Sequence, residues 1–108
     1  MDAFKNILIV ESDKALRESL VEQFSTIKNL HVSDTSDARE ALDHLEGTHF
    51  TLLIIAINLP ESDCVDICQF VKSNNLGCSI ILMIDSGSII QNSIFEDLGV
   101  EVYLKKPF

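Results

Sequence analysis

Basic residues are scarce in this chain. Its 108 residues include 8 lysines and arginines against 17 aspartates and glutamates, which gives a formal net charge of −9 at pH 7. Apart from the adjacent Lys105 and Lys106, the basic residues are scattered. A protein that binds nucleic acid or an anionic membrane directly needs a concentrated basic patch. The composition therefore argues against both kinds of partner for this segment.

Long apolar runs are missing as well. The strictly apolar stretches span a handful of residues, whereas a membrane-spanning helix needs about 20. The chain begins Met-Asp-Ala-Phe-Lys-Asn, without the basic stretch, apolar segment and cleavage site of a secretory signal. Its three cysteines, an odd number, fit a reducing compartment where thiols stay free. We expect a cytoplasmic protein without disulfides, folded as one domain over residues 1–108.

Short apolar runs alternate with amphipathic stretches along the whole chain. The pattern predicts strands at residues 7–10, 30–33, 51–57, 79–84 and 102–104, and helices at 14–27, 38–47, from 62–63 to about 73, and 88–98. Apolar runs that alternate with helices in this way indicate a parallel sheet covered on both faces. The sequence therefore predicts a doubly wound α/β domain.

Local signals mark the ends of the expected helices. Ser36 and Asp37 are predicted to cap one helix, which Gly47 stops, and Ser62 and Asp63 are predicted to cap the next. The segment 74–77, Asn-Asn-Leu-Gly, is predicted to end that helix.

Polar side chains follow the expected strands at the point where each strand ends. In parallel sheets these carboxyl ends meet at one edge, where doubly wound domains carry their functional groups. The candidate pocket consists of Glu11, Ser12, Asp13, Ala56, Asn58, Asp85 and Lys106. Acids, an amide and one lysine therefore converge on this edge.

Several segments, in order, resemble the receiver domain of two-component response regulators. They are the strand 7–10 followed by an acid, Asn58-Leu59-Pro60 with Asp63 downstream, the strand 81–84, and the closing Tyr-Leu-Lys-Lys-Pro-Phe of residues 103–108. The resemblance covers nearly the whole chain and implies a five-stranded parallel sheet of order 2-1-3-4-5, as in flavodoxin-like folds. The overall look is similar to the winged-helix transcription factors of the family.

The resemblance assigns roles to some positions. In the family, acids after the first and third strands hold Mg²⁺, and the third-strand aspartate takes phosphate from a histidine kinase. Glu11 matches the first acid, Lys106 the lysine that binds phosphate, and Tyr103 the aromatic residue of the switch. Asn58 matches the residue whose backbone carbonyl faces the metal.

Three positions depart from the family pattern. Ser12 stands at the second acid, Ala56 at the phosphate-accepting aspartate, and Asp85 at the hydroxyl that binds phosphate. Asp13 could join the acidic pair only if the strand before it were shifted. A methyl group cannot form an acyl phosphate, and Mg²⁺ loses two of its carboxylates. We expect no metal, no cofactor and no catalysis.

Asp85, Glu11 and Lys106 are expected to form an ion network. This network either holds the switch in one state or is a structural salt bridge without signalling consequence.

Other candidates for chemistry are weak. Cys64 and Cys68 share an apolar helix face and are expected to be buried thiols that act as small hydrophobic groups. The acids Glu61, Asp63 and Asp66 are expected to be solvated groups in a first helical turn. Three histidines lack ligand spacing, and Gly87 lies outside any nucleotide-loop pattern.

The sequence thus favours an atypical receiver module, independent of phosphorylation, that regulates output through protein contacts. The likeness to transcription factors suggests that the output is transcription. The expected partners are its own effector domain, a second subunit and a histidine kinase. The chain ends at Phe108, before the fifth helix of a receiver, so self-association is expected. The alternatives are a flavodoxin-like domain that binds a small ligand or nucleotide, and an enzyme, which is disfavoured because no nucleophile, base and oxyanion set is visible.

Overall fold

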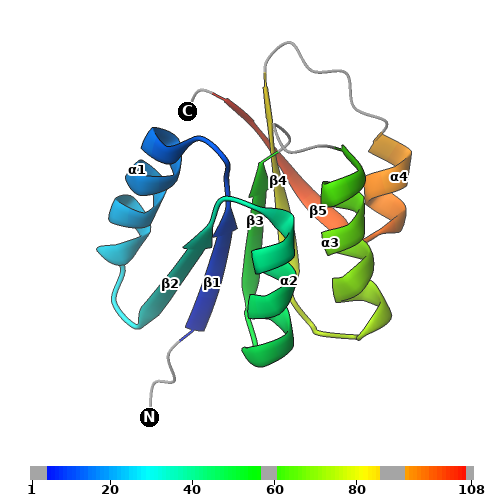
Figure 1. Ribbon diagram of the computed structural model, residues 1–108, viewed down its shortest axis with the longest axis horizontal. Helices are drawn as coiled ribbons and strands as arrows, with labels where there is room; N and C mark the ends of the chain where they lie inside the picture. Colours follow the sequence, from blue (N-terminus) through cyan, green and yellow to red (C-terminus); the bar gives the residue numbers. More distant parts are fainter. Residues whose placement is uncertain (1–4, 57–60, 86–91, 107–108) are drawn as a thin grey trace.

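A parallel sheet of five strands, in the order β2-β1-β3-β4-β5, forms the centre of the molecule (Figure 1). The computed structural model describes residues 5–56, 61–85 and 92–106, without the side chains of residues 61, 85, 92–94, 101 and 104–106. The strands are β1 Lys5–Val10, β2 Leu30–Thr35, β3 Leu52–Ala56, β4 Ser79–Asp85 and β5 Val100–Lys106. The predicted fold class and strand order are confirmed.

Four helices connect these strands, and they lie on both sides of the sheet (Figure 1). They are α1 Lys14–Ser25, α2 Ala38–Gly47, α3 Glu61–Ser73 and α4 Asn92–Asp97. Helix α1 packs on one face, whereas α2, α3 and α4 pack on the other. No described helix is long and apolar enough to cross a membrane.

Some predicted boundaries were wrong by a few residues. Helix α3 begins at Glu61, so Ser62 and Asp63 lie inside its first turn and do not cap it. Proline is favoured just where a helix starts, and in this sequence Pro60 directly precedes Glu61. Helix α1 ends at Ser25, two residues before the predicted end. The predicted helix residues 88–91 lie outside the described residues.

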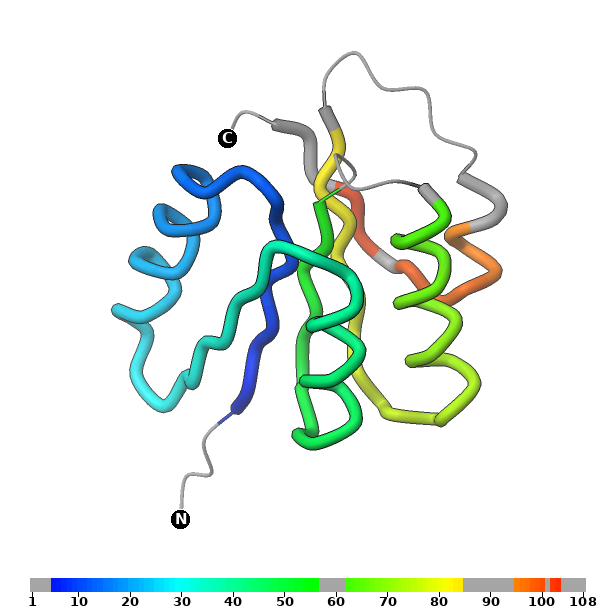
Figure 2. Tube along the Cα trace, in the orientation of Figure 1, coloured from blue at the N-terminus to red at the C-terminus, as the bar shows by residue number. Residues whose placement is uncertain are grey.

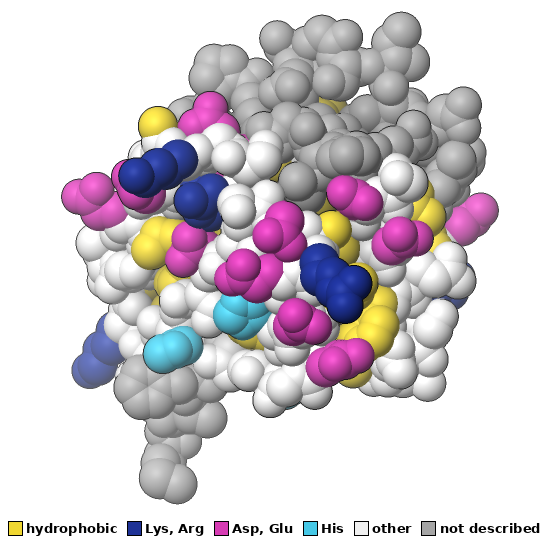
Figure 3. All heavy atoms as spheres, viewed as in Figure 1, with side chains coloured by type: hydrophobic (Ala, Val, Ile, Leu, Met, Phe, Trp, Pro, Cys, Tyr) yellow, Lys and Arg dark blue, Asp and Glu magenta, His cyan; other side chains and the backbone are white. Residues whose placement is uncertain are grey.

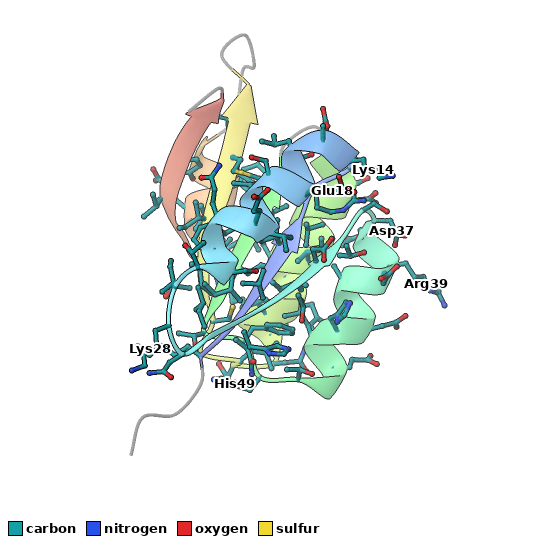
Figure 4. The ribbon with its side chains drawn as sticks, turned by 90° about the vertical axis from the view of Figure 1, so that its left-hand side faces the viewer. Lys14, Glu18, Lys28, Asp37, Arg39 and His49 are labelled. Atoms are coloured by element: carbon teal, nitrogen blue, oxygen red, sulfur yellow. The ribbon has the colours of Figure 1, made fainter. Side chains whose placement is uncertain are left out.

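Two aspartates cap the helices on either side of β2. The carboxylate of Asp37, which is labelled in Figure 4, accepts a hydrogen bond from the Glu40 N–H at 2.8 Å. This bond confirms the predicted cap of α2. The Asp13 carboxylate accepts from the Leu16 N–H at 3.1 Å and caps α1. Each bond satisfies a backbone donor that the helix itself leaves unpaired.

The core divides into two layers because strand side chains alternate between the faces of the sheet. The layer under α2, α3 and α4 includes Leu8, Val10, Leu53, Ile55, Leu82 and Phe95. The layer under α1 includes Ile7, Ile9, Ile54, Ala56 and Met83. Both faces of β1 and β3 are therefore buried, as their continuous apolar runs predicted.

Strand β5 carries an irregularity in its pairing with β4. Ile80 pairs with Val100, but the next residue, Ile81, pairs with Val102. One extra residue on β5 is therefore accommodated, as in a β-bulge, and the alternation of side chains changes there. Beyond this point Tyr103 pairs with Leu82 and packs against the core layer under α3. The predicted strand, 102–104, lies within the part of β5 that follows this irregularity, and β5 extends beyond it at both ends.

Candidate functional site

The carboxyl ends of the strands meet at one edge of the sheet, as Figure 2 shows for the central strands. Val10, the last residue of β1, is in register with Ile55. Glu11 therefore follows β1 beside Ala56, the last residue of β3. Both are fully buried, with 0% of each residue exposed. The structure thus places two buried residues, one acidic and one apolar, at the ends of adjacent strands.

Hydrogen bonds hold both the side chain and the backbone of Glu11. Its side-chain Oε2 accepts from the Asp13 N–H at 3.1 Å, and its own N–H donates to the Thr35 carbonyl at 3.0 Å. A buried carboxylate is costly unless hydrogen bonds or opposite charges compensate for the lost water. These contacts fix the position of Glu11 at the edge of the sheet.

Ser12 and Asp13 differ from Glu11 in exposure. Both residues are exposed to solvent. One oxygen of the Asp13 carboxylate is engaged in capping α1. Among the three candidates that follow β1, only Glu11 is buried against the core.

Sequence reasoning missed the contribution of Arg17 to this edge. Its Nη1 donates to the Glu11 carbonyl at 2.9 Å, and its Nε donates to the Asp34 carboxylate at 3.1 Å. The guanidinium therefore joins α1 to the end of β1 and to β2. The available signal was its place one helical turn after Asp13, where a long side chain reaches back toward the preceding strand.

Ala56 is also in contact with α3. The Cys64 thiol donates a weak hydrogen bond to the Ala56 carbonyl, with Sγ and O 3.6 Å apart. Cys64 and Cys68 are both fully buried, as predicted. Burial, followed by the neighbouring Cys64, raises the pKa of the Cys68 thiol to about 12. This thiol is therefore neutral and acts as a small apolar group.

Asp85 and Lys106 end their strands opposite each other, because their backbones are partners in the register of β4 and β5. Their side chains lie outside the described residues, as does Asn58. The ion network of Asp85, Lys106 and Glu11 therefore stays a prediction.

Tyr103 is half-buried on β5 and packs against the core. Burial raises the pKa of its hydroxyl, with smaller contributions from the neighbouring Glu96 and Cys68. The hydroxyl is therefore neutral, and the ring lies on the face that α3 and α4 cover.

The described part of this edge holds few groups that could bind a metal ion. Among the side chains that the structure describes, no group of three or more His, Cys, Asp or Glu residues is placed to hold a metal ion. The described residues at this edge offer the Glu11 carboxylate and the exposed Ser12 and Asp13, next to a methyl group at Ala56. Mg²⁺ is usually recruited by one or two well-placed carboxylates together with substrate phosphates. Of the two carboxylates described here, only Glu11 is buried at the strand end, whereas Asp13 is exposed and caps α1.

Relatives with similar sequences are response regulators. The chain is 29% identical over 102 residues to "Response regulator MprA" of Mycolicibacterium vanbaalenii, which covers 94% of this chain and 44% of that protein. The chain thus spans less than half the length of this curated relative.

Solved structures and a family model agree with that likeness. A receiver domain of an HD domain-containing protein from Pseudomonas fluorescens superposes with a TM-score of 0.85 at 23% identity, covering 97% of this chain and 84% of that one. A putative response regulator from Chloroflexus aurantiacus gives a TM-score of 0.80 at 26% identity, covering 97% and 87%. The family model "Response regulator receiver domain" matches residues 7–108. The chain belongs to the response regulator receiver domain family.

Proposed function

We propose that this receiver domain works in a two-component pathway without phosphorylation at the end of β3. The observation that carries the proposal is Ala56, which is fully buried at the strand end beside Glu11. Covalent transfer of a phosphoryl group to this position needs a carboxylate nucleophile, and an alanine methyl has no oxygen. The domain then passes on its signal through protein contacts alone.

The donors around Ala56 support the same proposal. Glu11 is engaged with the Asp13 backbone, and Ser12 is an exposed residue where the family pattern has an acid. A magnesium ion recruited here would lack both the second acid and the strand-end aspartate. Without the metal, the charge of an incoming phosphoryl donor is not neutralised.

We further place the Lys106 ammonium between the carboxylates of Asp85 and Glu11, so that no phosphate is needed to neutralise it. The backbone register of Asp85 with Lys106 and the burial of Glu11 support this arrangement. Breaking a buried ion pair from one side costs about 3–5 kcal/mol, whereas an exposed pair contributes about 1 kcal/mol or less. Urea unfolding of Asp85→Ala should therefore show a fall of about 3–5 kcal/mol in the free energy of unfolding. A fall below about 1 kcal/mol would contradict the network.

The partners follow from the family. We propose a histidine kinase, an effector domain and a second subunit as the proteins that this domain contacts, in the cytoplasm, with regulation of transcription as the output. The curated relative extends well beyond the region that matches this chain, which covers 44% of it. This supports a role as the receiver part of a longer regulator. The flavodoxin-like alternative with a nucleotide or other small ligand at the strand ends is not favoured.

The test is phosphorylation with acetyl phosphate and Mg²⁺, followed by intact-mass measurement. We expect no stable phosphate adduct, while a receiver with an aspartate at the corresponding strand end is modified in the same reaction. The Ala56→Asp variant should gain little, because Ser12 still weakens the metal site. A phosphate adduct on the unaltered chain, mapped to an acid at the strand ends, would overturn the proposal.

A further inference from the structure

The described helix α4 depends on contacts from outside itself. It spans Asn92–Asp97, which is six residues. Isolated helices shorter than about 12–15 residues are marginal in water, so tertiary contacts have to hold a helix of this length. One such contact is Phe95, which is fully buried in the core layer under α2, α3 and α4. This ring fixes the inner side of α4, but it does not pair the carbonyls at the end of the helix.

The last turn of α4 carries charge of the unfavourable sign. Backbone carbonyls at the end of a helix carry partial negative charge, which cations stabilise and carboxylates oppose. The last turn of α4 contains no basic residue, and Glu96 and Asp97 are both acidic and exposed. The acidic residues of α4 therefore destabilise its own carboxyl-terminal end.

Two of the carbonyls at this end are paired by the turn that follows. The Leu98 N–H donates to the Phe95 carbonyl at 3.1 Å. The Gly99 N–H donates to the Glu96 carbonyl at 3.0 Å, with Gly99 at a φ of 93°, which glycine adopts at little cost. The next carbonyl, that of Asp97, is paired from another helix.

Lys72, in the last turn of α3, supplies that partner. Its Nζ donates a hydrogen bond to the Asp97 carbonyl and brings a positive charge to the end of α4. The end of α3 itself is closed locally, because the Asn75 N–H donates to the Lys72 carbonyl at 3.2 Å. The two helices lie side by side (Figure 1), so one ammonium meets the negative end of each.

We propose that Lys72 forms an electrostatic clasp, the contact of its Nζ with the Asp97 carbonyl, which holds the end of α4 against α3. With the clasp closed, the ammonium caps this carbonyl and offsets the carboxylates of Glu96 and Asp97. When the charge is lost, α4 keeps the packing of Phe95, but its last turn frays. The clasp is a conformational device that does not involve Ala56, and it operates whether or not the strand-end site accepts phosphate.

The test is native-state hydrogen exchange of the whole chain at pH 7, followed by NMR and expressed as protection factors. Lys72→Met keeps most of the hydrocarbon but removes the charge and the donor. We expect it to lower the protection of the Leu98 and Gly99 amides about two- to fivefold, the range of one exposed charged contact. The amides of α1 should keep the protection of the unaltered chain. Unchanged protection at Leu98 and Gly99, or an equal loss in α1, would overturn the proposal.

A second variant tests the electrostatic part of the clasp. Adding Asp97→Asn to Lys72→Met removes one of the carboxylates that the ammonium offsets, so part of the lost protection at Gly99 should return. In Asp97→Asn alone the gain should be smaller, because Lys72 already offsets that charge. Equal gains in the two backgrounds, or no recovery, would contradict the clasp.

The matched control is Lys28→Met, which removes the same charge from the exposed turn between α1 and β2 (Figure 4). It should leave the protection of Leu98 and Gly99 unchanged. A loss equal to that in Lys72→Met would show that net charge, and not a contact with α4, sets the protection, and would overturn the proposal.

Discussion

Cys68 shows how one buried side chain makes the stability of the whole domain depend on pH. Its thiol has a pKa of about 12 in the folded chain, against 9.0 for an unperturbed thiol. Below pH 9 the thiol keeps its proton in both the folded and the unfolded chain, so the stability that the buried neutral thiol contributes is fully present. Above pH 9 the unfolded chain releases the proton first, and the folded state loses stability until the pH reaches the folded pKa.

We therefore expect the free energy of unfolding to fall by up to about 1.4 kcal/mol for each pH unit above 9 on account of this thiol. The Cys68→Ala variant loses packing at every pH, but its decline above pH 9 should be shallower than that of the unaltered chain. Urea unfolding between pH 7 and pH 10.5, in the presence of reductant, measures both slopes. Cys78, whose pKa is also raised, is present in both proteins and cancels in the comparison. Identical slopes would show that Cys68 does not titrate in this range.

At the scale of the elements, Arg17 is the side chain that joins three of them. It belongs to α1, donates to the Glu11 carbonyl at the end of β1, and pairs with Asp34 on β2. The side chain of Arg17 is only 16% exposed, so this pair is better shielded than a typical surface ion pair. The guanidinium is planar and donates in two directions at once, which a lysine ammonium cannot reproduce with the same geometry.

We expect Arg17→Lys to lower the free energy of unfolding by about 1–2 kcal/mol, because one charge-assisted hydrogen bond is lost or lengthened. Urea unfolding at pH 7 measures the change. The control is Lys14→Met, which removes the exposed ion pair between Lys14 and Glu18, 3.9 Å apart on α1 (Figure 4). That change should stay within about 0.5 kcal/mol, the usual range for exposed pairs on a helix. Equal losses in the two variants would contradict a bridging role for Arg17.

At the scale of the whole molecule, negative charge dominates. The formal net charge is −9 at pH 7, and carboxylates are spread over the face that α2 and α3 present (Figure 3). Helix α2 alone contributes Glu40, Asp43 and Glu46, and Asp37 caps it. Repulsion between like charges destabilises a compact state, and salt weakens it.

We therefore expect sodium chloride to stabilise the fold. The Debye length falls from about 30 Å at 0.01 M salt to about 8 Å at 0.15 M, so most of the repulsion across this face is screened over that range. The melting temperature, followed by circular dichroism, should rise with salt. In Asp43→Asn, which removes one of the clustered charges, the rise should be smaller. A melting temperature independent of salt would mean that ion pairs offset the repulsion.

The order of the elements and the faces that they bury follow from the amino-acid sequence alone. The apolar runs of β1 and β3, the cap at Asp37 and the helix ending at Asn75 act within a few residues, so local patterns are sufficient to predict them. The methyl group at Ala56 is likewise a property of the sequence, and the match of its neighbourhood to receiver domains is enough to predict its place at a strand end.

Which distant residues meet is set by the tertiary structure. Burial of Glu11, the two contacts of Arg17 and the irregular register of β5 all depend on how separate elements pack. The hydrophobic period of each segment says which face turns inward, but it does not say what lies opposite that face. Those contacts arise from the close packing of side chains from separate segments of the chain, which exists only in the folded state.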